Sequence, residues 1–203
     1  MATEALDLAN LPAPLGDVIM RRPCGASETL FRQGDPVYAI FAVAEGGVRL
    51  VRHGADGRTL TLHTARAGES FAEAALFSDN YHCDAVTDID SVVAIIPKPA
   101  LLDAMARDRG LTEAFMALLA SQVRDLRSRI ELRNIRLARE RVVAWLMLAG
   151  ADRGVTLNRP LNVVASEIGL SHEALYRALA KLAEDGVIER TERFIKLNDN
   201  SAA

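Results

Sequence analysis

Few of the features that mark secreted, membrane or disulfide-rich proteins occur in this sequence. It has only two cysteines, Cys24 and Cys83, which are too few for a disulfide framework and are typical of a reducing cytoplasm. No apolar run approaches the roughly 20 residues that a membrane-spanning helix needs. The N-terminal stretch carries acidic residues instead of a basic region followed by an apolar segment, so we expect no secretory signal. These absences predict a cytoplasmic protein without a membrane segment.

The excess of one charge sign over the other is small, and catalytic motifs are scarce as well. The net charge of −3 speaks mildly against nucleic-acid binding, but a local basic face is sufficient for phosphate contacts, so this class remains open. The sequence contains no nucleophile elbow, phosphate loop, zinc-ligand spacing or dinucleotide-binding fingerprint. We therefore predict that the protein is not an enzyme. Half of its residues are hydrophobic and a quarter are charged, which is typical of a globular protein.

Residues 20–96 have the pattern of a small β domain. Turn-forming stretches that contain Gly or Pro separate short runs rich in β-branched, aromatic and other apolar residues, at 39–44, 48–52, 60–63 and 91–96. Proline pre-sets one turn angle and glycine supplies positive φ, so these stretches predict turns. Many short strands at close spacing predict an antiparallel barrel or sandwich. Cys24 is expected to precede the strands, and His53 and His63 are expected to be surface or strand residues.

Beyond Pro97 the pattern becomes helical, and one segment is unusually long. Residues 111–135 contain no glycine or proline, and their apolar positions recur at spacings of three and four. A helix of about 25 residues is longer than a domain of this size usually needs. We therefore expect a helix that pairs with a second copy, through Met116, Leu119, Val123, Leu126 and Ile130. Packing of this helix on its own domain is the alternative.

The stretch 161–190 has the pattern of a helix-turn-helix. A first helix, over 162–168, stops at Gly169, the residue type that most readily takes the left-handed cap position. Ser171 then stands at the N-cap of a second helix. The apolar positions of this second helix share one side, namely Leu175, Leu179 and Leu182. Two apolar runs that follow, at 187–188 and 194–197, predict the two strands of a wing.

The exposed side of the second helix carries side chains that can read DNA bases. Arginine donates two hydrogen bonds to guanine, and glutamate accepts one from cytosine. Glu173 and Arg177 are four residues apart, so both would reach the same groove. An ion pair on a solvated helix would explain this pair alone, but Gly169, Ser171 and the wing favour DNA readout. The predicted DNA-binding residues are Ser171, His172, Glu173, Tyr176, Arg177 and Lys181.

The chain as a whole resembles the CRP/FNR family of transcription regulators. The matching segments are ETLFRQGDP at 28–36, the run 43–62, GESFAEAALF at 68–77, the long helix, and 166–190. The resemblance implies an α+β protein with an N-terminal antiparallel β-barrel of the jelly-roll, cyclic-nucleotide-binding type. It implies a sensor domain at 1–109, a dimerisation helix at 110–136 and a winged helix-turn-helix at 137–203. The implied partners are a second copy, double-stranded DNA and, for an activator, RNA polymerase.

The family pattern also assigns the recognition helix. Glu173 and Arg177 match the base-reading glutamate and arginine of the family. Many members carry a further arginine directly after the N-cap serine, where this chain has His172. This difference weakens one expected base or phosphate contact and leaves the half-site sequence open.

The resemblance further implies an effector pocket, but one that departs from cyclic AMP binding. Members that bind cyclic AMP hold its ribose with a Gly-Glu pair and its phosphate with an arginine followed by Ser or Thr. Here Ala72 replaces the glycine, and Cys83 and Asp84 replace the Arg-Ser pair. The phosphate would lose charge-assisted hydrogen bonds of about 1.5–3 kcal/mol each and would meet a carboxylate. The pocket residues implied are Phe71, Ala72, Glu73, His82, Cys83, Asp84, Gln122 and Leu126.

We therefore expect a signal other than cyclic AMP, and its identity stays open. A different small ligand or an empty apolar pocket, a thiol sensor at Cys83, and heme remain the alternatives. His82 could activate the neighbouring thiol, but adjacent strand residues point to opposite faces. The simplest interpretation of Cys83 is a buried small hydrophobe. An alternative function for the whole chain is a ligand-sensing module that acts through protein contacts without specific DNA readout.

Overall fold

A computed structural model describes residues 11, 14–54, 57, 59–150, 153–157 and 160–198, and the statements below concern these residues. The chain divides into two compact units, Met1–Ser121 and Gln122–Ala203. Among the described residues, no helix is both long enough and apolar enough to cross a membrane.

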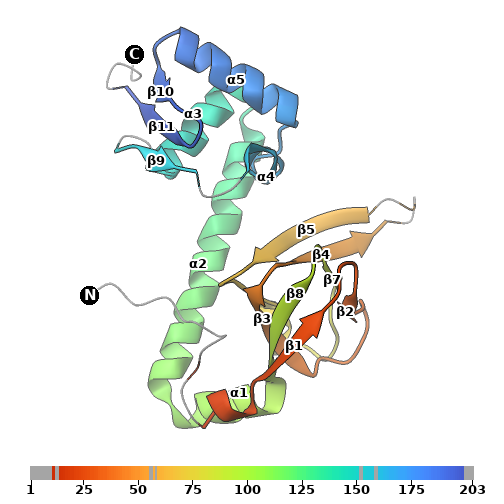
Figure 1. Cartoon of the computed structure of the whole chain (residues 1–203). Helices are drawn as coiled ribbons and strands as arrows, with labels where there is room; N and C mark the ends of the chain where they lie inside the picture. The colour runs from red at the N-terminus through yellow and green to blue at the C-terminus, as the bar shows by residue number, and fades with distance from the viewer. Residues whose placement is uncertain are drawn as a thin grey trace. The chain divides into compact units, whose positions relative to one another are not determined.

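The first unit contains two four-stranded antiparallel sheets (Figure 1). Their strand orders are β1-β8-β3-β6 and β2-β7-β4-β5. The strands are β1 (Met20–Cys24), β2 (Thr29–Phe31), β3 (Ala39–Glu45), β4 (Gly47–His53), β5 (Thr59–Arg66), β6 (Ser70–Phe71), β7 (Asp84–Thr87) and β8 (Ser91–Pro97). The short 3-10 helices are η1 (Gly16–Val18) and η2 (Glu73–Ala75). The predicted α+β jelly-roll is confirmed, although its two sheets stay open and do not close into a barrel.

Strand β3 is apolar and buried from Ala39 to Val43 because both of its faces are covered there. Ala39, Phe41 and Val43 belong to the core that includes residues of both sheets. Ile40 and Ala42 alternate with them and belong to a second core, which includes Leu101 of α1 and Phe115 of α2. Successive strand residues point to opposite faces, so a strand between two cores needs apolar residues at every position.

Aromatic rings fill the core of the first unit. The Phe31 and Tyr81 rings stack with centroids 3.7 Å apart, and Phe41 and Phe71 stack at 5.1 Å. The Tyr81 hydroxyl donates to the Ala39 carbonyl at 2.6 Å. Burial raises the pKa of Tyr81 to about 12. The prediction for Cys24 was wrong: it ends β1 and is buried in this same core.

Strand β8 passes into helices almost without a loop. It ends at Pro97, and α1 (Lys98–Arg107) begins at the next residue. Asp108, whose backbone is extended, alone separates α1 from α2 (Arg109–Asn134). Its carboxylate accepts a hydrogen bond from the Leu111 amide at 3.1 Å. The predicted long helix is thus confirmed as one unbroken helix (Figure 1).

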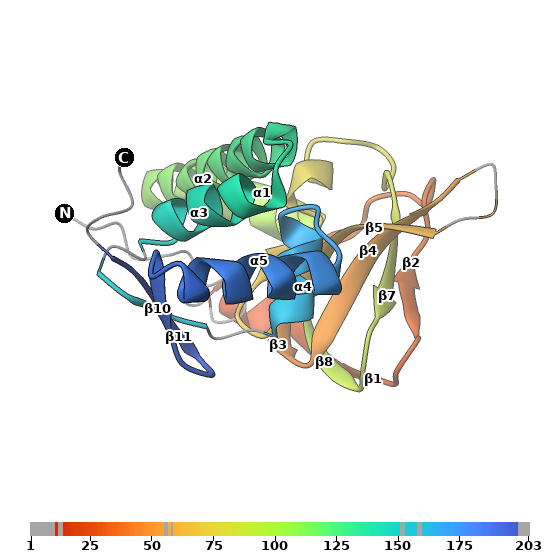
Figure 2. The same ribbon diagram turned by 90° about the horizontal axis from the view of Figure 1, so that it is seen from above.

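The second unit is a winged helix-turn-helix. Its elements are α3 (Ala138–Leu148), β9 (Val155–Thr156), α4 (Leu161–Glu167), α5 (His172–Glu184), β10 (Ile188–Arg190) and β11 (Phe194–Leu197). Figure 2 shows α4 crossing α5, with the wing strands β10 and β11 beside α5. The wing sheet has the order β10-β11-β9. Its core includes the fully buried residues Val142, Leu146, Leu175, Leu179, Leu182 and Ile195.

Candidate functional site

Helix α5 begins with the cap geometry that its sequence predicts. Gly169 adopts a φ of 70° after α4, and Ser171 is the extended N-cap residue of α5. The Ser171 hydroxyl accepts a hydrogen bond from the Ala174 amide at 3.2 Å. This bond satisfies one of the amide groups that the first turn of a helix leaves unpaired. The turn and the cap together fix where α5 starts.

The burial of α5 divides the helix into an apolar and a polar side. Leu175, Leu179 and Leu182 are fully buried against the core of the second unit. The six predicted DNA-binding residues are all exposed, namely Ser171, His172, Glu173, Tyr176, Arg177 and Lys181. The fold thus presents these side chains together on one side of the helix.

Glu173 and Arg177 are held by local contacts at the start of α5. The Arg177 Nε donates to the backbone carbonyl of Glu173 at 3.4 Å. Hydrogen bonding from its own backbone amide, followed by that from the Ser171 hydroxyl, lowers the pKa of Glu173. The glutamate is therefore held ionised, which is the state that accepts a hydrogen bond from a base amino group.

Lys181 differs from the other predicted DNA-binding residues because its ammonium group forms ion pairs with acidic neighbours. Its ammonium group lies 3.1 Å from a Glu184 carboxylate oxygen and 3.0 Å from one of Asp185. The hydrogen bonds to Asp185 and then to Glu184 raise its pKa. Asp185 also pairs with Arg139 of α3. Lys181 would have to leave these partners in order to contact a phosphate.

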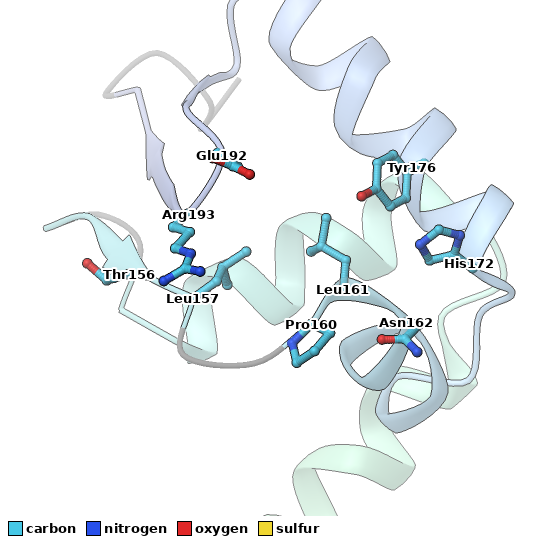
Figure 3. Close-up of a pocket in the computed structure, with 9 residues that line it drawn as sticks. All are labelled: Thr156, Leu157, Pro160, Leu161, Asn162, His172, Tyr176, Glu192 and Arg193. Atoms are coloured by element: carbon cyan, nitrogen blue, oxygen red, sulfur yellow. The ribbon is translucent and has the colours of Figure 1, made fainter.

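A groove of about 570 Å³ lies between α5 and the wing (Figure 3). His172 and Tyr176 line it from α5, and Glu192 and Arg193 lie across it at the turn between β10 and β11. The remaining lining residues are Thr156, Leu157, Pro160, Leu161 and Asn162. The groove thus continues the exposed side of α5 toward the wing.

Two contacts join Tyr176 to its surroundings. Its ring lies 4.5 Å, between centroids, from the His172 ring. The Arg190 guanidinium, from β10, lies over the same ring at 5.3 Å from its centroid. Arg190 was not predicted from the sequence, because its contact depends on how the wing folds back on α5. A basic residue two positions after the predicted wing strand at 187–188 was the available signal.

In the predicted effector pocket, the backbone around Ala72 keeps a conformation that favours glycine. Ala72 has φ 66° and ψ 14°, which costs an L-residue roughly 1–2 kcal/mol. Phe71 and Glu73 on either side are buried. The Ser70 hydroxyl donates a hydrogen bond to the Glu73 carboxylate. The exchange of glycine for alanine, inferred from the family pattern, therefore leaves a left-handed turn and a buried carboxylate in place.

His82 and Cys83 lie in a bend that precedes β7, so their predicted place on a strand was wrong. Their side chains nevertheless differ in environment, because His82 is exposed and Cys83 is buried in the core. Burial raises the pKa of the Cys83 thiol, against the opposing effect of the Arg52 charge. A buried thiol held in its protonated form is a poor nucleophile.

Asp84 brings a partnered carboxylate to the place where the family pattern expects Ser or Thr. One oxygen accepts a hydrogen bond from the Gln33 amide at 2.7 Å. The other lies 3.3 Å from the His53 ring nitrogen Nε2. Within the described residues, no group of three or more His, Cys, Asp or Glu side chains could hold a metal ion.

The remaining predicted residues lie on α2. Gln122 and Leu126 belong to the second unit, whereas the other six pocket residues belong to the first, so one shared pocket stays a prediction. Of the predicted dimer residues, Met116, Val123, Leu126 and Ile130 are exposed. Leu119 is half-buried and packs against the core of the first unit.

Comparisons with known proteins agree on both units. A family model described as "Cyclic nucleotide-binding domain" matches residues 21–108, and one described as "Crp-like helix-turn-helix domain" matches 140–202. The chain is 30% identical to the cyclic AMP receptor protein of Thermus thermophilus, over 93% of this chain and 85% of that protein. It is 25% identical to the transcriptional activator protein FnrA of Stutzerimonas stutzeri, over 97% and 84%.

A solved structure supports the same fold. FixK2 from Bradyrhizobium japonicum superposes with a TM-score of 0.64 at 23% identity, covering 90% of this chain and 93% of that one. At this identity the likeness concerns the fold alone.

Proposed function

Because the chain belongs to the CRP/FNR family of transcription regulators, we propose that it reads a near-palindromic DNA site as a homodimer. Glu173 and Arg177 read bases, and Ser171, His172 and Tyr176 complete the contact surface. Two copies of α5 then enter successive major grooves about 34 Å apart. The observation that carries this proposal is the exposed, capped start of α5, where Glu173 and Arg177 stand on the side opposite the buried leucines.

The exposed apolar residues of α2 support the homodimer. Met116, Val123, Leu126 and Ile130 recur along this helix at spacings of three, four and seven residues, and each exposes about half of its surface or more. Large apolar side chains that gather in this way mark an interaction surface. Covering them with a second copy of α2 removes apolar surface from water and holds two recognition helices together.

The sensor domain, in this proposal, responds to a signal other than cyclic AMP. A cyclic phosphate is a permanent anion and needs a cationic partner. In place of that partner the chain has the buried, protonated thiol of Cys83 and the carboxylate of Asp84. The raised pKa of Cys83 and the exposure of His82 also make a thiol sensor at this position unfavourable.

The place of action follows from the function. A DNA-binding regulator works in the cytoplasm, and an activator of this kind would contact RNA polymerase. The relative from Stutzerimonas stutzeri is named a transcriptional activator, and we infer that this chain likewise performs no catalysis.

Selection from a pool of random duplexes tests the proposed function. The native protein should enrich a motif with two-fold symmetry, and Arg177→Ala should abolish the enrichment while the variant still folds and dimerises. Arg107→Ala is the matched control, because Arg107 is an exposed arginine in a helix of the first unit. If the native protein enriches no motif, the chain acts through protein contacts instead.

A thermal-shift titration with cyclic AMP tests the sensor domain. A saturable shift of the melting temperature would contradict the proposal that the signal is not cyclic AMP.

A further inference from the structure

Tyr176 links the recognition helix to the wing. The residue is 42% exposed, and its ring has a neighbour from each of two elements. His172, one helical turn earlier in α5, lies 4.5 Å away between ring centroids with the planes tilted by 56°. Arg190, the last residue of β10, places its guanidinium over the ring at 5.3 Å from the centroid.

This cation–π contact holds the Arg190 guanidinium without using its hydrogen-bond donors. A guanidinium over an aromatic face is attracted by the electrons of the ring, at distances up to about 6 Å. A contact with a ring face uses none of the guanidinium N–H groups, so these donors remain available to another group. Arg190 is therefore held in one place with donors that suit an oxyanion.

The charges around Arg190 determine what can approach it. Arg193 and Glu192 line the groove between α5 and the wing (Figure 3). Glu189 precedes Arg190 in β10, and successive strand residues point to opposite faces, so its carboxylate lies on the other side of the strand. In the proposed complex, a duplex whose major groove holds α5 would pass beside this junction and would expose its phosphates there.

We propose that Arg190 binds a phosphate of the DNA backbone and that Tyr176 is the platform that positions its guanidinium. This inference rests on the proposed function and deepens it. A phosphate contact carries no sequence information. The pair therefore sets affinity and salt dependence, whereas Glu173 and Arg177 set the sequence that is read.

The salt dependence of binding measures this contact directly. Each phosphate contact contributes about 0.9 to the slope of log K against log salt, so a dimer that loses two contacts should lose about 1.8. Arg190→Gln in the full-length protein should lower the slope by this amount on the selected site and on a scrambled duplex. Affinity should fall by up to about 25-fold, from at most about fivefold for each exposed contact. The selected motif should not change.

Tyr176 variants separate the platform from other roles. Tyr176→Phe keeps the aromatic face and should keep the salt slope of the native protein, whereas Tyr176→Leu should lower the slope as Arg190→Gln does. Combining Tyr176→Leu with Arg190→Gln should add little, because both remove the same contact. Fluorescence of Trp145 verifies that each variant is folded.

Several results would overturn the inference. An unchanged salt slope in Arg190→Gln shows that this residue does not bind phosphate. A changed motif in Tyr176→Leu shows that the ring reads a base, and a loss of affinity in Tyr176→Phe shows that the hydroxyl is the contacting group. A native protein that binds both duplexes equally refutes the proposed sequence readout but leaves this slope test valid. One that binds neither duplex overturns both proposals.

Discussion

Truncation of Leu126 to alanine should weaken the proposed dimer by an amount that the structure allows us to estimate. Leu126 exposes 57% of its surface. Burying a whole leucine side chain contributes about 1.5–3 kcal/mol, so covering this fraction contributes about 1–1.7 kcal/mol. The residue occurs in both protomers, and alanine keeps part of the contact. The expected loss is about 1.5–2.5 kcal/mol per dimer, which raises the dissociation constant about 10- to 70-fold.

Leu148→Ala supplies the matched control. Leu148 lies at the end of α3 and also exposes 57% of its surface, so the two substitutions remove equal amounts of exposed apolar surface. Sedimentation velocity over a dilution series measures the dissociation constant of each variant. Leu126→Ala should dissociate at higher concentrations than the native protein, and Leu148→Ala should behave as the native protein does. Equal constants for all three proteins would refute the assignment of α2 as the dimer helix.

Three further predictions concern single side chains. Ser171→Ala should lower the free energy of unfolding of the second unit by about 1 kcal/mol, because the Ala174 amide loses its cap. Urea unfolding followed by Trp145 fluorescence measures this free energy, and an unchanged unfolding midpoint would contradict the prediction. Iodoacetamide should label Cys83 more slowly in the folded than in the unfolded chain at pH 8, because burial raises its pKa. Mass spectrometry of the labelled peptides measures both labelling rates, and equal rates would contradict the prediction. Tyr81 ionises at a pKa of about 12 when folded and about 10 when unfolded. Its contribution to stability is therefore complete below about pH 10 and is lost toward pH 12. Tyr81→Phe should flatten the fall in unfolding free energy over this range, and an equal slope in both proteins would show the reasoning to be wrong.

The parts of the fold that local chemistry specifies could be predicted from the sequence. The stretch 111–135 has no helix breaker, and α2 extends over Arg109–Asn134. Gly169 and Ser171 mark the turn and the cap within a few residues of each other, so α5 and its exposed side followed from spacing alone. The exposure of the candidate DNA-binding residues was predictable for the same reason.

Features that depend on tertiary contacts were not predictable in this way. Strand β1 contains Pro23 and was not predicted; its place at the edge of a sheet tolerates a residue without an amide hydrogen. Strand β9 has only two residues and pairs with β11. The contact of Arg190 with Tyr176 requires the wing to fold back on α5. The ion pairs of Lys181, by contrast, follow from spacings of three and four and could have been anticipated.

The junction between β8 and the helices contains almost no loop residues. The Lys98 amide donates to the Tyr38 carbonyl at 2.9 Å, which ties the first residue of α1 to the residue before β3. From there to Asn134, Asp108 is the sole described residue outside a helix. Because Leu101 of α1 and Phe115 of α2 pack in the same core as Ile40 of β3, a displacement of this sheet would reach both helices with no loop between them to absorb it.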